Sequence, residues 1–325
     1  MPIRSEQVKS LANSLGFDAC GIVSAVAAHE DLRSFKEWIA KGYHGEMKYL
    51  EDFETRARRF WEGFPEAKSI IVVGVNYYTE TTKKGQAPFG LGRVARYAWG
   101  KDYHQVIAKR LEEFRDRLEK LSGGKIRAEI GVDTQPLLER SLAQKAGLGF
   151  IGKQSQLLSP KFGPWLFLGE LVTDLELDSD APYLGNCGDC TICIDECPTD
   201  AIRPGSEIDA RRCIAYLTIE HKTEIAEELK PFIGDWVFGC DICLQVCPYA
   251  KKGKETSWDE LKPERGHGPE MNLLDILEIK SNRAYERKFE GTAIMRARRK
   301  QLQRNAKIVL ENKTPGTGSP GDRFA

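Results

Sequence analysis

The chain has 325 residues, and its 48 basic and 48 acidic side chains give a formal net charge of zero. This length allows two domains with their own apolar cores. A neutral chain has no overall field that attracts nucleic acid or membrane, and no apolar run reaches the ~20 residues of a membrane helix. With no evident secretory leader and an odd cysteine count, the composition suits a reducing compartment, and we expect a cytoplasmic protein.

The first 180 residues are predicted to form a mixed domain of helices and strands. The spacing of apolar residues and the residues that end helices predict the helices, and runs of β-branched residues predict the strands. The predicted helices cover residues 5–15, 32–42, 107–121 and 134–146, and the predicted strands cover 17–23, 69–77, 127–132 and 163–177. The run over 69–77 is apolar almost throughout, so it is expected to be a central, fully buried strand.

Two cysteine groups dominate the middle of the chain. Three cysteines spaced two residues apart, then a fourth three residues further on and a proline, are typical of bacterial ferredoxins, whose fourth cysteine binds the neighbouring cluster. The second group ends in the same Cys-Pro pair and has the distant Cys213 in place of a close third cysteine. This crossing rule predicts one 4Fe–4S cluster on Cys187, Cys190, Cys193 and Cys247. It predicts a second cluster on Cys197, Cys213, Cys240 and Cys243.

Other uses of these cysteines fit the pattern less well. Structural zinc uses separated Cys-x-x-Cys pairs and gives no reason for a third evenly spaced cysteine. A disulfide framework conflicts with the odd count of nine cysteines. The ninth, Cys20, lies in an apolar run and is expected to be a buried structural thiol. The motif therefore favours a ferredoxin-like domain that passes single electrons.

Several segments outside the cysteine groups carry candidate functional side chains. Residues 93–104 combine aromatic rings, cations and a histidine, which is unusual for a plain loop. Asp133 follows a predicted strand, where it could either serve chemistry or support the N-terminus of the next helix. Glycines over 147–152 allow close approach of a bulky ligand without forming the dinucleotide-binding fingerprint. Arg56 lies in a basic stretch that could equally be a solvated helix face.

Clusters in series require an electron acceptor, which leaves an enzyme or an electron carrier as the two broad classes. A first domain with buried strands and a polar, glycine-lined loop system favours the enzyme. Asp102 and His104 begin like the cobalamin motif Asp-x-His-x-x-Gly, but Ile107 stands where the glycine should be. Ligation of cobalt by His104 is therefore not expected.

Seven segments together resemble the epoxyqueuosine reductase family, in family order and over nearly the whole chain to about residue 310. They are residues 96–104, 132–134, 146–153, 167–171, 187–198, 216–220 and 239–243. The resemblance implies an α+β protein with a cobalamin- and substrate-binding α/β-type domain, related to reductive dehalogenases, over 1–180. It implies a ferredoxin-like two-cluster domain over 181–262 and a short helical, HEAT-like stub over 263–312. By composition, residues 313–325 are expected to be a disordered tail.

The resemblance also implies a reaction, in which the epoxide on the modified wobble base of a tRNA becomes a cyclopentene in the last step of queuosine synthesis. It implies base-off cobalamin fed by the clusters, with Asp133 protonating the departing oxygen. The corrinoid contacts implied by the family are Arg56, Lys153, Ser155, Tyr216, Thr218 and Glu220. The substrate contacts implied are Arg96, Tyr97, Asp102, Tyr103 and His104.

The expected partners follow from the same resemblance. They are the anticodon loop of a tRNA and an external donor of flavodoxin or ferredoxin type, with the protein acting as a monomer. Arg96 and the cations of residues 281–307 are expected to contact phosphates, which would make binding sensitive to salt. Members of the family commonly continue into helical repeats, whereas here residues 302–310 resemble only the start of one. A reductive dehalogenase-like reductase of small molecules and a ferredoxin-type carrier remain as alternatives.

Overall fold

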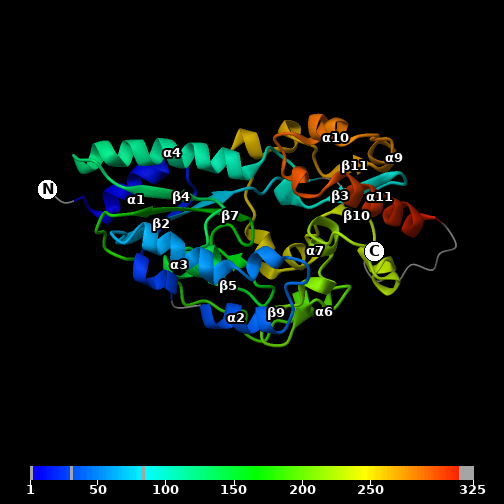
Figure 1. Cartoon of the computed structure of the whole chain (residues 1–325), viewed down its shortest axis with the longest axis horizontal. Coiled ribbons are helices and arrows are strands. Elements are labelled where there is room, and N and C mark those ends of the chain that lie inside the picture. Colours follow the sequence, from blue (N-terminus) through cyan, green and yellow to red (C-terminus); the bar gives the residue numbers. More distant parts are fainter. Residues whose placement is uncertain (1–2, 30–31, 82–84, 315–325) are drawn as a thin grey trace.

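A four-stranded antiparallel sheet forms the centre of the first half of the molecule (Figure 1). The computed structural model describes residues 3–29, 32–81 and 85–314. The strands run in the order β1 (Ala19–Ser24), β2 (Ser69–Asn76), β7 (Leu166–Thr173) and β4 (Ala128–Gly131). Every residue of β2 is buried, as its β-branched run predicts. Register pairs Gly131 at the end of β4 with Glu170 on β7, which matters for the site described below.

Helices cover both faces of this sheet. One face packs on α1 (Ser5–Ser14) and α4 (Tyr103–Ser122), and the other packs on α3 (Phe53–Gly63) and α5 (Glu139–Lys145). Helix α4 buries Ile107, Leu111, Phe114 and Leu118 completely, at the helical spacing read from the sequence. Each such side chain stabilises the fold by about 1.5–3 kcal/mol. This stripe fixes α4 on the sheet and so fixes the first turn of α4, which carries Tyr103 and His104.

A second core occupies the other half of the molecule (Figure 1). Its sheet places β3 (Leu91–Val94) between β10 (Trp236–Phe238), which is parallel to it, and β11 (Glu270–Asn272), which is antiparallel. The helices of this half are α7 (Ile214–Ile219), α9 (Leu273–Leu277), α10 (Asn282–Phe289) and α11 (Arg299–Lys313). The helical segment expected to be a separate stub therefore shares one core with the cluster-binding region. The segment around β3, expected in the first domain, also belongs here because it is the central strand of this sheet.

The α+β class expected from the sequence is confirmed, whereas several boundaries differ. The expected strand over 163–177 is ordered as β7 only from Leu166 to Thr173, and the helix expected from residue 134 begins at Glu139. The remaining elements are α2 (Leu32–Ala40), α6 (Ile192–Asp195), α8 (Ile242–Gln245), β5 (Phe150–Ile151), β6 (Leu157–Leu158), β8 (Ile202–Arg203), β9 (Glu207–Ile208) and ten 3₁₀ turns within the described ranges. In the part of the chain described, no helix combines the length and apolar character needed to cross a membrane. Residues 315–325 of the expected tail lie outside the described residues.

Candidate functional site

The first set of cysteines gathers around α6. Burial, followed by the charges of Cys187, Cys247 and Cys190, raises the pKa of the Cys193 thiol to about 11. Thiols that repel one another as thiolates are stable together when a metal centre neutralises them. The ammonium of Lys153 donates to the carbonyls of Gly188 (2.9 Å) and Cys190 (3.0 Å), so it anchors this loop.

The second set gathers around α8. Burial, followed by the charges of Cys213 and Cys197, raises the pKa of the Cys243 thiol well above its usual value. Burial, followed by Cys243 and Cys213, does the same for Cys240. The backbone N–H of Ala201 donates to the sulfur of Cys197 at 3.3 Å, a contact of the kind that tunes cluster-binding sulfurs. Cysteines from distant parts of the chain thus lie near one another around α6 and α8, and these eight thiols fit two iron–sulfur clusters.

A site for a single metal ion would need several ligand side chains that converge on one point. Within residues 3–29, 32–81 and 85–314, no three His, Cys, Asp or Glu side chains converge as ligands of one ion.

Asp133 lies two residues beyond β4, in the turn that precedes α5. Its φ of +55° is in the left-handed region, which aspartate tolerates better than most residues. The side chain is 67% exposed, and its Oδ2 accepts a hydrogen bond from the Tyr103 hydroxyl at 3.2 Å and lies 3.7 Å from His104 Nε2. The alternative in which Asp133 caps the next helix is wrong, because α5 begins at Glu139 and its N-cap residue is Leu138.

His104 faces Asp133 as a protonated imidazole. Burial disfavours the charged ring, yet hydrogen bonds to Asp102 and Asp133 outweigh burial and raise the pKa of His104 to about 9. Asp102 caps α4, and its Oδ1 lies 2.7 Å from His104 Nδ1. The His104 ring stacks on Tyr103 at 4.0 Å, and Tyr103 stacks on Phe167 at 4.3 Å, which holds both polar groups toward Asp133. Three of the expected substrate contacts are therefore brought together with the expected proton donor.

Tyr97 joins this group to the second cysteine set. Its ring packs edge-on against Tyr103 at 6.2 Å. The Tyr97 ring also packs against Phe238 at 6.1 Å, two residues before Cys240. Burial raises the pKa of Tyr97, and the charges of Asp241, Glu220 and Asp133 raise it further. Asp241 is in the cysteine loop of the second set. The Asp133 site and the loop of the second cysteine set are therefore neighbours, as a reaction that takes electrons from the second cluster requires.

Arg96 has a different place from the one expected. It is only 7% exposed, and its guanidinium lies between the rings of Tyr78, Trp99 and Trp165, at 4.6, 4.5 and 4.9 Å. Its backbone N–H donates to Asp241 at 2.6 Å. The expectation that Arg96 contacts phosphate or substrate is wrong, because aromatic rings enclose its guanidinium and stabilise the cation. Arg96 instead supports the cysteine loop, through its backbone N–H and through its charge near Asp241.

Thr218 is also corrected as a corrinoid contact. It has no exposed surface, and its hydroxyl donates to the carbonyl of Ile214 (2.8 Å) and accepts from the N–H of Gly239 (3.0 Å). A hydroxyl engaged in this way cannot reach a ligand. Tyr216 is buried as well, with its hydroxyl accepting from the N–H of Glu46 at 2.6 Å.

The other expected corrinoid contacts are distributed around the Asp133 turn and the cysteine loops. The exposed Arg56 donates to the carbonyl of Thr134 at 3.4 Å, one residue beyond Asp133. Ser155 has a φ of +61°, and its hydroxyl donates to a backbone carbonyl at 2.7 Å. Glu220 pairs with Arg296 at 2.5 Å.

Two glutamates beside Asp133 were missed from the sequence. Glu139 accepts a hydrogen bond from the Asp133 backbone N–H at 2.5 Å, and Glu170 is completely buried on β7. The available signal was a carboxylate within the apolar run 166–173, because an unpaired acid is rarely placed in a buried strand.

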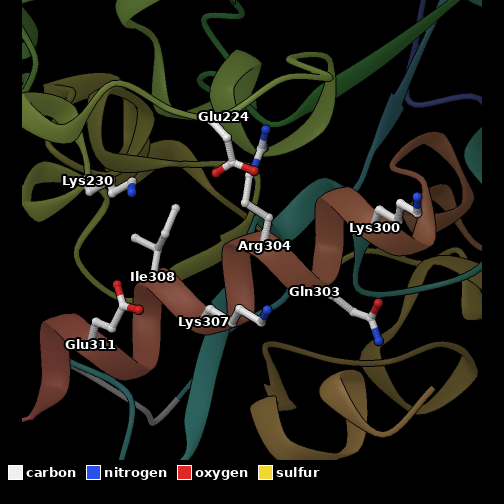
Figure 2. Close-up of a pocket in the computed structure, with 8 residues that line it drawn as sticks. All are labelled: Glu224, Lys230, Lys300, Gln303, Arg304, Lys307, Ile308 and Glu311. Atoms are coloured by element: carbon white, nitrogen blue, oxygen red, sulfur yellow. The ribbon is translucent and has the colours of Figure 1, made fainter. Parts of the chain in front are cut away.

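A cationic pocket of about 330 Å³ lies on α11 (Figure 2). None of the expected cluster, corrinoid or wobble-base contacts lines it, but Lys300, Arg304 and Lys307 belong to the cations of residues 281–307 that were expected to contact phosphates. Its lining residues are Glu224, Lys230, Lys300, Gln303, Arg304, Lys307, Ile308 and Glu311. Figure 2 shows Glu224 and Lys230 facing the helix from the opposite segment. Arg304 donates to the carbonyl of Leu217 at 2.6 Å and of His221 at 2.9 Å, which ties α11 to the chain beside Glu220.

The fold and the site together define an iron–sulfur oxidoreductase in which two cysteine sets lie beside an acid–imidazole site. Two family models match the chain: "Epoxyqueuosine reductase QueG, DUF1730" over residues 58–134 and "4Fe-4S double cluster binding domain" over residues 186–250. The epoxyqueuosine reductase of Leadbetterella byssophila is 39% identical over 94% of this chain and 98% of its own length. The chain belongs to the epoxyqueuosine reductase family.

Solved structures agree with this assignment. An epoxyqueuosine reductase solved with an epoxyqueuosine-modified stem loop of tRNA-Tyr has a TM-score of 0.83 and 31% identity, and the match covers 94% of this chain and 80% of that one. The Bacillus subtilis epoxyqueuosine reductase, solved with its catalytic aspartate loop swung out of the active site, has a TM-score of 0.81 and 30% identity, covering 94% and 81%.

Proposed function

We propose that the chain reduces epoxyqueuosine to queuosine in the anticodon loop of tRNA, using cobalamin and two 4Fe–4S clusters. The observation that carries this proposal is the exposed carboxylate of Asp133, which lies beside protonated His104 and near the second cysteine set. A proton donor and a source of electrons are the two requirements for converting an epoxide to an alkene and water. The sequence match to enzymes of this name supports the substrate.

Asp133 is the proposed proton donor to the departing epoxide oxygen. The Tyr103 hydroxyl holds one oxygen of Asp133, and the His104 imidazolium next to it can compensate negative charge once the proton has left. When bound, cobalamin supplies the reducing chemistry at the substrate carbon, while the protein supplies position, protons and electrons. The partly exposed polar side chains around Asp133 could hydrogen-bond to the amide groups at the edge of a corrinoid. Because the cobalt is part of the corrinoid, it needs no separate metal site in the protein. Arg56, Lys153, Ser155 and Glu220 remain the proposed contacts, whereas Tyr216 is not proposed, because it is buried and its hydroxyl accepts from the Glu46 N–H.

The two clusters are proposed on the cysteine sets given above, and the distant ligand Cys213 is the most informative to test. Replacing Cys213 with alanine should remove about half of the iron and sulfide from anaerobically purified protein, since clusters need all four thiolates. Cys20→Ala is the matched control, because Cys20 is outside both sets, and it should keep the full load. A full load in Cys213→Ala would show that this ligand is misassigned.

Substrate binding is proposed to place the unstacked wobble base against Tyr97, Asp102, Tyr103 and His104, because chemistry on a base requires it to leave the stack. The tRNA backbone is proposed to run over the pocket on α11, where the exposed Lys300 and Lys307 can meet phosphates. Binding should then weaken steeply with salt. Lys300→Ala with Lys307→Ala should reduce the salt slope by about 1.4–1.8, since each phosphate contact contributes roughly 0.7–0.9.

The electron donor is proposed to be a small flavodoxin or ferredoxin, acting on a cytoplasmic monomer. The test of the whole function is anaerobic incubation of reconstituted protein with epoxyqueuosine-bearing tRNA and a chemical reductant. Formation of queuosine supports the proposal. Turnover of halogenated organics without any change in the tRNA would instead support the dehalogenase-like alternative.

A further inference from the structure

The carboxyl group of Glu170 is completely buried inside the protein. It sits on β7 opposite Gly131, has no exposed surface, and neither of its oxygens has a hydrogen-bond partner of standard geometry among the described residues. A Cβ placed on Gly131 would lie 3.4 Å from Glu170 Oε2, so the end of the strand that leads to Asp133 passes directly over this carboxyl.

Such a group should be neutral near pH 7. A buried carboxylate without a cation or a donor is costly, and the group keeps its proton instead. In agreement, burial and then the charge of Glu139 raise the pKa of Glu170 well above its usual value.

Glu139 connects Glu170 to the Asp133 turn. It is the first residue of α5, and its Oε1 accepts the backbone N–H of Asp133 at 2.5 Å. Burial and then the charge of Asp133 raise the pKa of Glu139 to about 7. Glu139 therefore contacts the Asp133 turn through the backbone, and the carboxyl groups of Glu170, Glu139 and Asp133 are close enough to shift one another's pKa.

The proposed reaction needs more protons than Asp133 holds. Conversion of an epoxide to an alkene and one water consumes two electrons and two protons, and a carboxylic acid carries a single proton. Asp133 must therefore be reprotonated within each turnover, at a moment when bound substrate and corrinoid would limit access of water.

We propose that Glu139 and Glu170 form a buried carboxyl pair that holds one proton and passes it to Asp133 during each turnover. This rests on the proposed function. In the transfer, the O–H bond at Glu170 breaks as one forms at the Glu139 carboxylate, and the O–H bond at Glu139 then breaks as one forms at the Asp133 carboxylate. The pair is left without its proton and is reloaded with one from solvent after product leaves. No electrons move in this exchange.

Other charged groups face the same turn. They are Tyr49, Arg56, Tyr103, His104, Arg140 and Glu220. Among the acids, His104 holds its proton up to a pKa of about 9, because Asp102 and Asp133 outweigh the effect of burial, so it is the weaker donor near neutrality. Tyr103 is weaker still, since burial and Asp133 raise its pKa.

The test uses Glu139→Gln in the holoenzyme. The amide oxygen of glutamine still accepts the Asp133 N–H and keeps the turn, but glutamine cannot carry the proton. The steady-state rate of epoxyqueuosine reduction on tRNA should fall by roughly 10²-fold, which is the usual rate contribution of a positioned proton donor. The change in rate that the wild type shows near pH 7 should be absent from the pH–rate profile of the variant. Glu129→Gln, on the same strand as Gly131, is the matched control and should retain the wild-type rate and profile.

A second measurement needs no substrate. Infrared spectra of the holoenzyme at pH 7 should show the C=O stretch of a protonated carboxyl that is lost in Glu170→Gln and kept in Glu129→Gln. Wild-type rate and pH profile in Glu139→Gln, or no such band in the wild type, would overturn the carboxyl pair. If the wild type fails to reduce the epoxide at all, the proposed function fails, and proton delivery fails with it, whatever the infrared band shows.

Discussion

Replacing Asp133 with asparagine removes the proposed proton and little else. The variant should fold normally, because Asn tolerates the φ of +55° and can still accept from the Tyr103 hydroxyl. Asp133 does not cap a helix, and its side chain is 67% exposed, so loss of its attraction to His104 should cost at most about 1 kcal/mol of unfolding free energy. An alanine variant would be a poorer test, because alanine at this φ adds roughly 1–2 kcal/mol of strain.

The effect on chemistry should be far larger than the effect on stability. Loss of a positioned general acid lowers turnover by roughly 10²–10⁴-fold, equivalent to about 3–5 kcal/mol of the activation free energy. The assay is nucleoside analysis of tRNA after anaerobic turnover, with thermal unfolding, iron content and the cobalamin absorption spectrum measured on the same preparation. A folded Asp133→Asn protein with full cofactor load and near-normal turnover would refute the role of Asp133.

Three further predictions test neighbouring groups. Because the folded-state pKa of His104 is raised from 6.5 to about 9, its contribution to stability is complete below about pH 6.5 and is lost as pH rises through 9, so urea unfolding of His104→Gln should show a flatter pH dependence than the wild type. Thr218→Val should lower the unfolding free energy by about 1–3 kcal/mol through the unpaired Gly239 N–H, without a selective loss of cobalamin affinity; a selective loss would restore Thr218 as a ligand. Arg96→Met should reduce the iron content bound at the loop of Asp241, because it removes the cation that stabilises the buried Asp241 carboxylate, while tRNA affinity keeps its salt slope; a reduced slope would show that Arg96 contacts phosphate.

Elements defined by local spacing were predictable from the sequence. The cysteine spacing predicted two iron–sulfur clusters, and the structure brings the eight thiols near one another, while their division into two sets of four stays a prediction. The apolar stripe of α4 and the buried run of β2 could be predicted, because hydrophobic periodicity is a local property of the chain. The position of Asp133 at a strand end also followed from local sequence.

Features that depend on packing between distant segments could not be predicted. Arg96 lies in a segment rich in cations and aromatic residues, which suggested a surface for phosphate, yet Tyr78 and Trp165 from two other segments enclose it. The role of Glu170 depends on the register that sets it opposite Gly131, and no local pattern specifies which residues of two strands face each other.

The central claim is that this chain converts epoxyqueuosine to queuosine. The most direct measurement is mass analysis of nucleosides from epoxyqueuosine-bearing tRNA after anaerobic incubation with the protein, cobalamin and reductant. We expect the modified nucleoside to lose one oxygen atom, in a reaction that depends on both added cobalamin and intact clusters. An unchanged nucleoside, with protein that carries both clusters and binds cobalamin, would contradict it.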